Sequence, residues 1–350
     1  MAVMTASPRA RRSRSRISRM PLAGVAALGL LALSACGSGD DAGGGGGEGG
    51  GLDVVASFYP MEFLAERIGG DHVSVSTLTE PGVEPHDLDL SPRETARLSE
   101  ADLVVYLRGL QPAVDEAVEQ SGVAHVAEAT SFTTLETHGD EVDGEEHAED
   151  EHAEDEHAED EHAEEGHAEE GDGHDHEGGD PHIWLDPVRY AEVAQGVGEA
   201  LAEADPDNAA DYERNAEQLV GELQALDDEF AAGLADVPNR TFITTHAAFG
   251  YLAERYELRE EAITGLDPES EPSAARMRDL QEIAREDGVT TVFFETLVSD
   301  ETARTLADDL GLETAVLDPV EGITDDSPGA DYLEVMRANL AALQQALGAR

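Results

Sequence analysis

Residues 52–78 read LDVVASFYPMEFLAERIGGDHVSVSTL and contain a strand, a helix and a second strand in that order. Residues 54–56 form a short apolar run typical of a buried strand, and residues 60–68 carry apolar side chains at helical spacing behind a proline. Residues 73–78 predict the second strand. A helix between two strands is the connection that neighbouring parallel strands need. This stretch therefore predicts an α/β fold with parallel-type sheets and flanking helices.

The same alternation continues on both sides of one long helical stretch. Apolar residues three or four apart run from 206 to about 234, and at ~1.5 Å per residue this helix would be about 40 Å long. We therefore predict two similar α/β lobes joined by one long connecting helix. Their expected bounds are an N-terminal lobe over 52–205, a connecting helix over 206–237 and a C-terminal lobe over 238–350. The expected further strands are 103–106, 241–245, 259–263, 291–294 and 314–317, and the expected further helices are 91–99, 111–120, one after Asp186, 249–256, 273–286, 300–310 and one from 331.

The beginning of the chain predicts export and lipid anchoring. Six arginines precede an apolar run over 21–33, which is too short for a comfortable membrane span, and the sequence Leu-Ser-Ala-Cys follows. Cys36 is the only cysteine, and its position resembles the bacterial lipobox, in which that residue receives a diacylglyceryl group. Residues 1–36 are thus expected to be a lipoprotein signal peptide and the Gly-rich residues 37–51 a tether. This places the protein outside the cytoplasm, on the outer face of the cell membrane.

A low-complexity insertion at residues 138–179 carries much of the formal net charge of −57. Its histidines mostly recur every five residues, a period that matches neither helix nor strand, and we expect disorder in the absence of metal. Such acidity excludes nucleic acid as a partner, because phosphate binding needs clustered cations. The histidines predict auxiliary, low-affinity metal binding; the alternative is a solvated spacer. They are His147, His152, His157, His162, His167, His174 and His176.

Four residues outside the insertion stand at or after the carboxyl ends of predicted strands, where parallel sheets place ligands. They are His86, His182, His246 and Asp318, two in each lobe. A loop histidine alone is usually an exposed or hydrogen-bonding residue, and an aspartate before proline is a common turn device. Together, three imidazoles and one carboxylate would make a closed tetrahedral set suited to Zn²⁺. An imidazole-rich set favours Zn²⁺ over Mn²⁺.

Several linked motifs resemble the metal-binding receptors of bacterial ABC importers, the ZnuA/TroA-like family. They are ASFYP at 56–60, GVEPHD at 82–87, PHIWLDP at 181–187, THAAFGY at 245–251 and FET at 294–296. The resemblance covers nearly everything after the tether. It implies a monomeric receptor, without enzymatic activity, that captures Zn²⁺ between two lobes with a small hinge motion. It also implies delivery to an ABC permease that is driven by a cytoplasmic ATPase.

The resemblance also bears on the individual ligands. The third ligand of the family is His in zinc receptors and typically Glu in manganese receptors, and here it is His246. The last ligand, where one is used, aligns with Asp318; some members use water or a Glu next to the first His, a position held here by Pro85. Glu295 could orient a ligand, although an exposed or structural carboxylate is the simpler interpretation.

Three other functions compete with a zinc receptor. A zinc hydrolase would need an open coordination position and a general base, and the chain contains no His-Glu-x-x-His motif. A manganese or iron receptor of the same family is disfavoured by His246. An extracellular zinc-buffering or adhesion lipoprotein would bind metal through its repeat, and deleting residues 138–179 would then remove nearly all binding.

Overall fold

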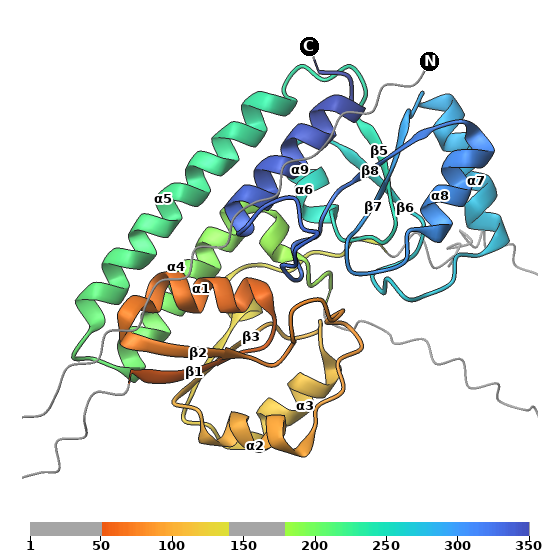
Figure 1. The fold of residues 1–350 in the computed structure, drawn as a ribbon. Helices are drawn as coiled ribbons and strands as arrows, with labels where there is room; N and C mark the ends of the chain where they lie inside the picture. The colour runs from red at the N-terminus through yellow and green to blue at the C-terminus, as the bar shows by residue number, and fades with distance from the viewer. Residues whose placement is uncertain (1–50, 140–178, 350) are drawn as a thin grey trace, which may run out of the picture. The chain divides into compact units, whose positions relative to one another are not determined.

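The computed structural model describes residues 51–139 and 179–349, and these lie in one compact unit that spans Glu48–Arg350 (Figure 1). The expected signal peptide, Cys36, almost all of the tether and the seven histidines of the repeat lie outside the described residues.

The first half of the chain forms a four-stranded parallel sheet in the order β2-β1-β3-β4. Alternate residues of its central strands enter two different cores, so both faces of the sheet are covered. Helix α1 packs with one core, and α2 and α3 with the other. The elements are β1 (Leu52–Ala56), α1 (Tyr59–Gly69), β2 (Val73–Thr77), α2 (Pro92–Glu100), β3 (Leu103–Tyr106), α3 (Pro112–Ser121) and β4 (His125–Glu128).

The second half repeats this arrangement, with strand order β6-β5-β7-β8 and all pairs parallel. One face of the sheet packs against α7 and α8, and the other joins the core that contains α9. The elements are β5 (Thr241–Thr244), α6 (Gly250–Arg255), β6 (Arg259–Ala262), α7 (Ala274–Glu286), β7 (Thr291–Phe294), α8 (Glu301–Leu310), β8 (Glu313–Val316) and α9 (Tyr332–Ala346).

Two helices, α4 (Pro187–Ala204) and α5 (Ala209–Leu234), lie between the two sheets in the order of the chain. They pack side by side. The 26 residues of α5 give it a length of about 39 Å. It contacts α1 of the first lobe and α9 of the second, so one helix spans both lobes (Figure 1). A single apolar core runs from Phe58 through Trp184 and Phe230 to Phe293. The lobes are therefore joined by continuous packing as well as by the chain.

The predicted two-lobe α/β fold is confirmed, and one strand was not predicted. Strand β4 has only two apolar residues, Val126 and Ala127, and Val126 is 42 % exposed because β4 lies at the edge of its sheet. So short a run gives no periodic signal. The helices expected from residue 91 and after Asp186 are present, and Ser91 and Asp186 are their N-caps: Ser91 makes a reciprocal capping box with Glu94, and Asp186 accepts from the backbone of Val188. The exact lobe boundaries stay a prediction.

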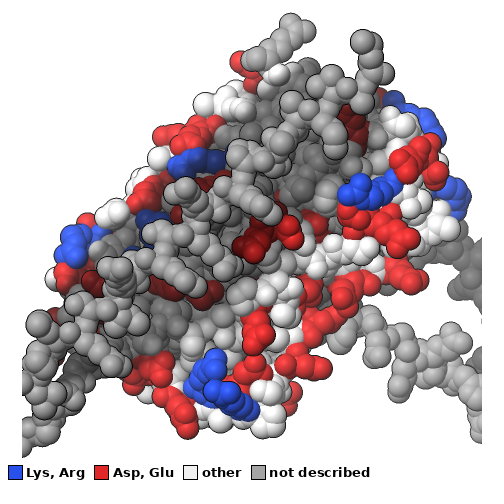
Figure 2. All heavy atoms as spheres, viewed as in Figure 1, with Lys and Arg blue, Asp and Glu red and all other residues white. Residues whose placement is uncertain are grey.

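Acidic side chains predominate on the described surface that Figure 2 shows. Among the described residues, no helix is both long enough and apolar enough to cross a membrane.

Candidate metal centre

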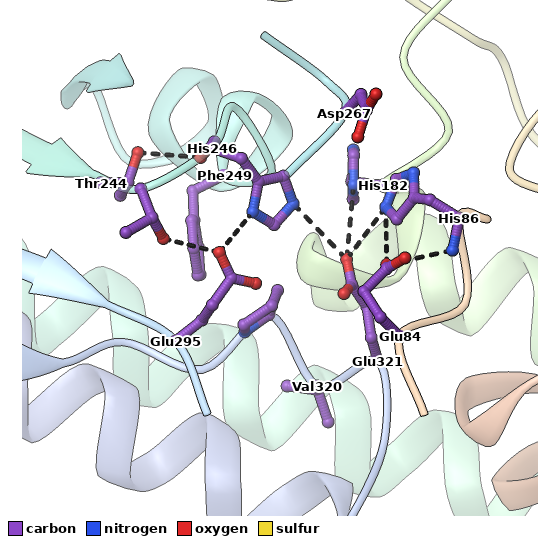
Figure 3. Close-up of polar contacts among 12 residues, drawn as sticks. Glu84, His86, His182, Thr244, His246, Phe249, Asp267, Glu295, Val320 and Glu321 are labelled. Atoms are coloured by element: carbon purple, nitrogen blue, oxygen red, sulfur yellow. Dashed lines mark hydrogen bonds and ion pairs between the residues drawn. The ribbon is translucent and has the colours of Figure 1, made fainter. Parts of the chain in front are cut away.

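Four side chains from four different loops meet between the two sheets (Figure 3). His86 lies in the loop after β2, and His182 stands just before the short 3-10 helix Ile183–Leu185 that leads into α4. His246 follows β5, and Glu321 follows β8. Each lobe contributes two of them. The parallel topology explains the meeting, because loops at the carboxyl ends of parallel strands gather at one edge of a sheet.

The carboxylate of Glu321 is the centre of this cluster. Its Oε1 lies 3.4 Å from Nε2 of His86, 3.6 Å from Nε2 of His182 and 3.5 Å from Nε2 of His246. The three imidazole ring centroids are 5.4 to 5.8 Å apart. All four residues are buried: His182 is fully enclosed, and His86, the most accessible, is 8 % exposed.

These spacings fit a tetrahedral zinc ion. Ligand atoms about 2.05 Å from a tetrahedral Zn²⁺ lie roughly 3.3 Å from each other, close to the distances between the carboxylate oxygen and the three nitrogens. Nε2 of His182, Nε2 of His246 and Oε2 of Glu321 are buried without a hydrogen-bond partner among the described residues. Buried polar atoms are normally satisfied, so three such atoms in one place indicate a ligand that joins them.

Two further carboxylates fix how the imidazoles face the centre. Oδ1 of the fully buried Asp180 lies 2.8 Å from Nδ1 of His182, and Oε1 of Glu295 lies 2.8 Å from Nδ1 of His246. With Nδ1–H donating to a carboxylate, each ring presents the lone pair of Nε2 to the cluster. Oε1 of Glu295 also accepts from the hydroxyl of Thr245 at 2.6 Å. The structure thus places Glu295 against a candidate ligand, buried rather than exposed.

The electrostatics of the cluster favour positive charge. Burial alone would lower the pKa of His246, but the neighbouring carboxylates of Glu295 and Glu321 outweigh this effect and hold the pKa well above its ordinary value. The pKa of His182 is raised in the same way by Asp180 and Glu321, against the effect of burial. Burial would raise the pKa of Glu321, but the three imidazoles that face its carboxylate hold the pKa well below its ordinary value. The cluster is thus built to hold protons or a cation.

Asp318, expected from the sequence as the fourth ligand, lies outside the cluster, and Glu321 is the carboxylate that faces the three imidazoles. Oδ1 of Asp318 accepts from the backbone N–H of Val320 at 2.8 Å, and its Oδ2 accepts from the hydroxyl of Thr296 at 3.0 Å. Val320 has a φ of 61°, in the left-handed region that a β-branched residue rarely adopts. Asp318 therefore holds the strained turn that carries Glu321 to the three imidazoles.

The same turn is anchored to the other lobe. Nε1 of Trp184 donates to the backbone oxygen of Pro319 at 2.7 Å, and the hydroxyl of Tyr332 donates to the backbone oxygen of Trp184 at 2.6 Å. Trp184 stands two residues after His182. One buried aromatic residue therefore sets the loop of a candidate ligand in the first lobe against the Glu321 turn of the second.

A cavity of about 240 Å³ opens on the His86 side of the cluster. Three aspartates line it together with His86: Asp87, Asp89 and Asp267. The carboxylates would attract a cation to the most accessible of the four ligands.

Sequence reasoning missed Glu321 and Asp180. Both lie close to features that it singled out: Asp180 stands directly before PHIWLDP, and Glu321 stands three residues after Asp318. The position of Glu321 depends on the backbone of Val320, which no sequence pattern reports. Asp180 stands two residues before His182, and that spacing is the one signal that could have identified it as an orienting carboxylate.

Comparison with known proteins gives a consistent picture. The sequence model of the ZnuA family, described as zinc-uptake complex component A, periplasmic, matches residues 54–346. The high-affinity zinc uptake system protein ZnuA of Bacillus subtilis is 34% identical over 323 residues, which cover 91% of this chain and 94% of that protein.

The zinc-binding lipoprotein AdcA of Streptococcus pneumoniae is also 34% identical, over 302 residues that cover 85% of this chain. This chain spans only 56% of the length of that relative. The crystal structure of Zn(II)-bound AdcA from the same species superposes with a TM-score of 0.67 at 31% identity, covering 85% of this chain and 58% of that one.

Proposed function

Because the chain belongs to the ZnuA family of zinc-uptake components, we propose that it is an extracytoplasmic receptor that captures Zn²⁺ and delivers it to the permease of an ABC importer. Zinc is the cargo, bound by His86, His182, His246 and Glu321 and released unchanged. The observation that carries the proposal is the meeting of three imidazoles and one buried carboxylate at tetrahedral spacing between two lobes.

The donor set accounts for the choice of metal. Three nitrogen donors and one oxygen donor suit Zn²⁺, whereas Mn²⁺ and Mg²⁺ prefer sites richer in oxygen. All four coordination positions come from the protein, so none is left for the activated water that a hydrolase needs. The site therefore supports binding and release, without chemical conversion of a substrate.

Delivery follows from how the ligands are divided. His86 and His182 belong to the first lobe, and His246 and Glu321 to the second. Pulling the lobes apart would leave the ion with two protein ligands, which lowers the affinity steeply. We propose that docking on a permease, powered by a cytoplasmic ATPase, does this. The continuous core around α5 would limit the motion to a small hinge. Lipidation of Cys36 would keep the monomeric receptor near the permease, on the outer face of the membrane.

Zinc titration calorimetry tests the capture step. The comparison uses the unaltered chain, His246→Ala, and a chain from which residues 141–177 are removed. We expect one tight site, lost in His246→Ala and retained after the removal. His72→Ala is the matched control, because His72 is a partly exposed histidine in a surface ion pair with Asp211, and such pairs contribute little to stability.

Tight binding that survives His246→Ala and disappears with residues 141–177 would refute the receptor and leave a metal-buffering repeat. A competition with Mn²⁺ in the same experiment tests the choice of metal. Displacement of bound Zn²⁺ by equimolar Mn²⁺ would contradict zinc as the cargo.

A further inference from the structure

The two ends of the undescribed stretch 140–178 are held together on α6 of the second lobe. The backbone N–H of Asp180 donates to the backbone oxygen of Glu136 at 2.8 Å. The hydroxyl of Tyr251 on α6 accepts from the backbone N–H of Glu136 at 2.9 Å and donates to the backbone oxygen of Asp180 at 2.8 Å. The residues on either side of the insertion are therefore fixed parts of the fold.

Three side chains of types that can ligate a metal ion converge beside this anchor. One ligand atom each from Glu136, His138 and Glu254 lies within 4.8 Å of the others, and Nε2 of His138 lies 3.3 Å from Oε2 of Glu254. They line a cavity of about 620 Å³, so an ion and its waters have room. The side chains of His138 and Glu254 are 19% and 56% exposed, so this cluster is open to solvent, unlike the buried centre.

The position of His138 is built into the local packing. Its ring meets that of Tyr251 edge to face, with centroids 4.6 Å apart. A Cβ on Gly250 would lie 2.5 Å from the side chain of His138, so only glycine at position 250 leaves room for this histidine. A freely placed surface histidine would have no such requirements.

The buried carboxylate of Asp180 contacts one histidine of each cluster. Oδ2 of Asp180 lies 2.9 Å from Nδ1 of His138, while its Oδ1 lies 2.8 Å from Nδ1 of His182. When both Nδ1 atoms donate to Asp180, both rings present Nε2 as a free lone pair: His182 to the buried centre, His138 to Glu136 and Glu254. Asp180 thus prepares His138 for metal binding in the same way as it prepares His182.

We propose that Glu136, His138 and Glu254 form a second, solvent-open binding site for a divalent transition-metal cation, with Zn²⁺ as the preferred ion. One imidazole and two carboxylates supply three protein ligands, and water completes the coordination, as in zinc sites with an open position. Because the ligands are partly exposed and one carboxylate, Glu136, is also paired with Arg189, the site binds more weakly than the buried centre.

The second site goes beyond the proposed receptor function, because it does not share a metal ligand with the buried centre. Its place in the chain gives it a role in capture. It stands where residues 140–178 join the folded part, with a single carboxylate between His138 and His182. An ion held there is concentrated next to the centre that binds it tightly.

The experiment needs a chain in which the repeat does not contribute. In the full chain, the seven histidines between positions 140 and 178 are replaced by glutamine, which keeps the length and every described residue. Zinc bound per chain is then measured by calorimetry and by metal analysis after gel filtration. Glu254→Gln and His138→Gln are each added to this background. Glu213→Gln, which alters an exposed glutamate on α5, is the matched control, and thermal unfolding of the metal-free variants checks that each folds.

We expect two Zn²⁺ per chain in the background and in the Glu213→Gln control, and one Zn²⁺ after Glu254→Gln or His138→Gln. Two Zn²⁺ in both variants, or only one in the background, would overturn the second site. Adding His246→Ala separates the two proposals. Loss of the tight ion alone, with the weaker ion retained, supports both. A background chain whose single ion is lost in His246→Ala keeps the receptor and removes the second site.

Discussion

The sharpest test of the buried centre is Glu321→Gln. Glutamine has the size of glutamate and keeps one oxygen at the same position, but it lacks the negative charge that faces three Nε2 atoms at 3.4 to 3.6 Å. The substitution therefore removes a charged ligand with little change in packing. Because the side chain is fully buried, solvent cannot compensate for the loss.

The expected size of the effect follows from the number of ligands. A four-ligand protein zinc site binds with about 10–16 kcal/mol, so one ligand accounts for roughly 2.5–4 kcal/mol. At about 1.4 kcal/mol for each tenfold change, Glu321→Gln should weaken zinc binding on the order of 10²–10³-fold. Competition against a chelator of known affinity measures the dissociation constant in this range.

Asp318→Asn is the matched control. Its carboxylate accepts from Val320 and Thr296 and holds the turn without reaching the imidazoles, and asparagine can keep the bond to the backbone of Val320. We expect a change in zinc affinity of about threefold or less, because no metal ligand is removed. A large loss in Asp318→Asn combined with unchanged affinity in Glu321→Gln would refute the assignment of Glu321 and restore Asp318 as the ligand.

Three other predictions can be tested on the same protein. Glu295→Gln should lower zinc affinity about 10–100-fold by loosening His246, as the same chelator competition would show. Zinc binding should release protons, and it should weaken as the pH falls through the raised pKa of His246, because a proton competes with zinc for the imidazole nitrogen. Calorimetry in buffers of different ionisation enthalpy measures the number of protons released. Burial raises the pKa of Glu260 from 4.5 to about 7, so the charge of this side chain lowers the stability of the fold above that pH. Glu260→Gln should therefore raise the free energy of unfolding by up to about 3 kcal/mol at pH 8 and have little effect near pH 4. Urea unfolding at the two pH values measures the difference.

Much of the fold could be predicted because its signals are local. Alternation of apolar runs and amphipathic stretches, with prolines and caps at helix starts, depends on residues only a few positions apart. The N-cap at Ser91 needs no knowledge of the rest of the chain. Strand β4 escaped prediction because its partner β3 supplies the stability that its own four residues do not.

In the candidate site, too, some residues could be predicted from local sequence and one could not. His86, His182 and His246 could be placed at strand ends from the sequence, and the structure brings them together with their Nε2 atoms toward one point. The carboxylate could not be placed, since a left-handed Val320 redirects the chain between Asp318 and Glu321. Here the three-dimensional path of three residues decides which of two acidic side chains faces the metal.

The second cluster is harder to predict from the sequence than the first, because its three residues come from parts of the chain that share no motif. Glu136 and His138 precede residues 140–178, and Glu254 follows strand β5 of the other lobe by ten residues. They meet only because Tyr251 holds both ends of the insertion on α6. A cluster of this kind becomes visible once the tertiary contacts are known.

The carboxylates that orient His182 and His246 each come from the same lobe as the imidazole, and this bears on the proposed release of the ion. His182 is oriented by Asp180 from its own loop, and His246 by Glu295 from its own lobe. Glu321 differs, since its one carboxylate reaches the imidazoles of both lobes. If the lobes separate as proposed, His182 and His246 keep their orienting carboxylates, while Glu321 loses its contacts to the first lobe. Under that proposal, the site would give up its ion while these two imidazoles stay oriented for the next one.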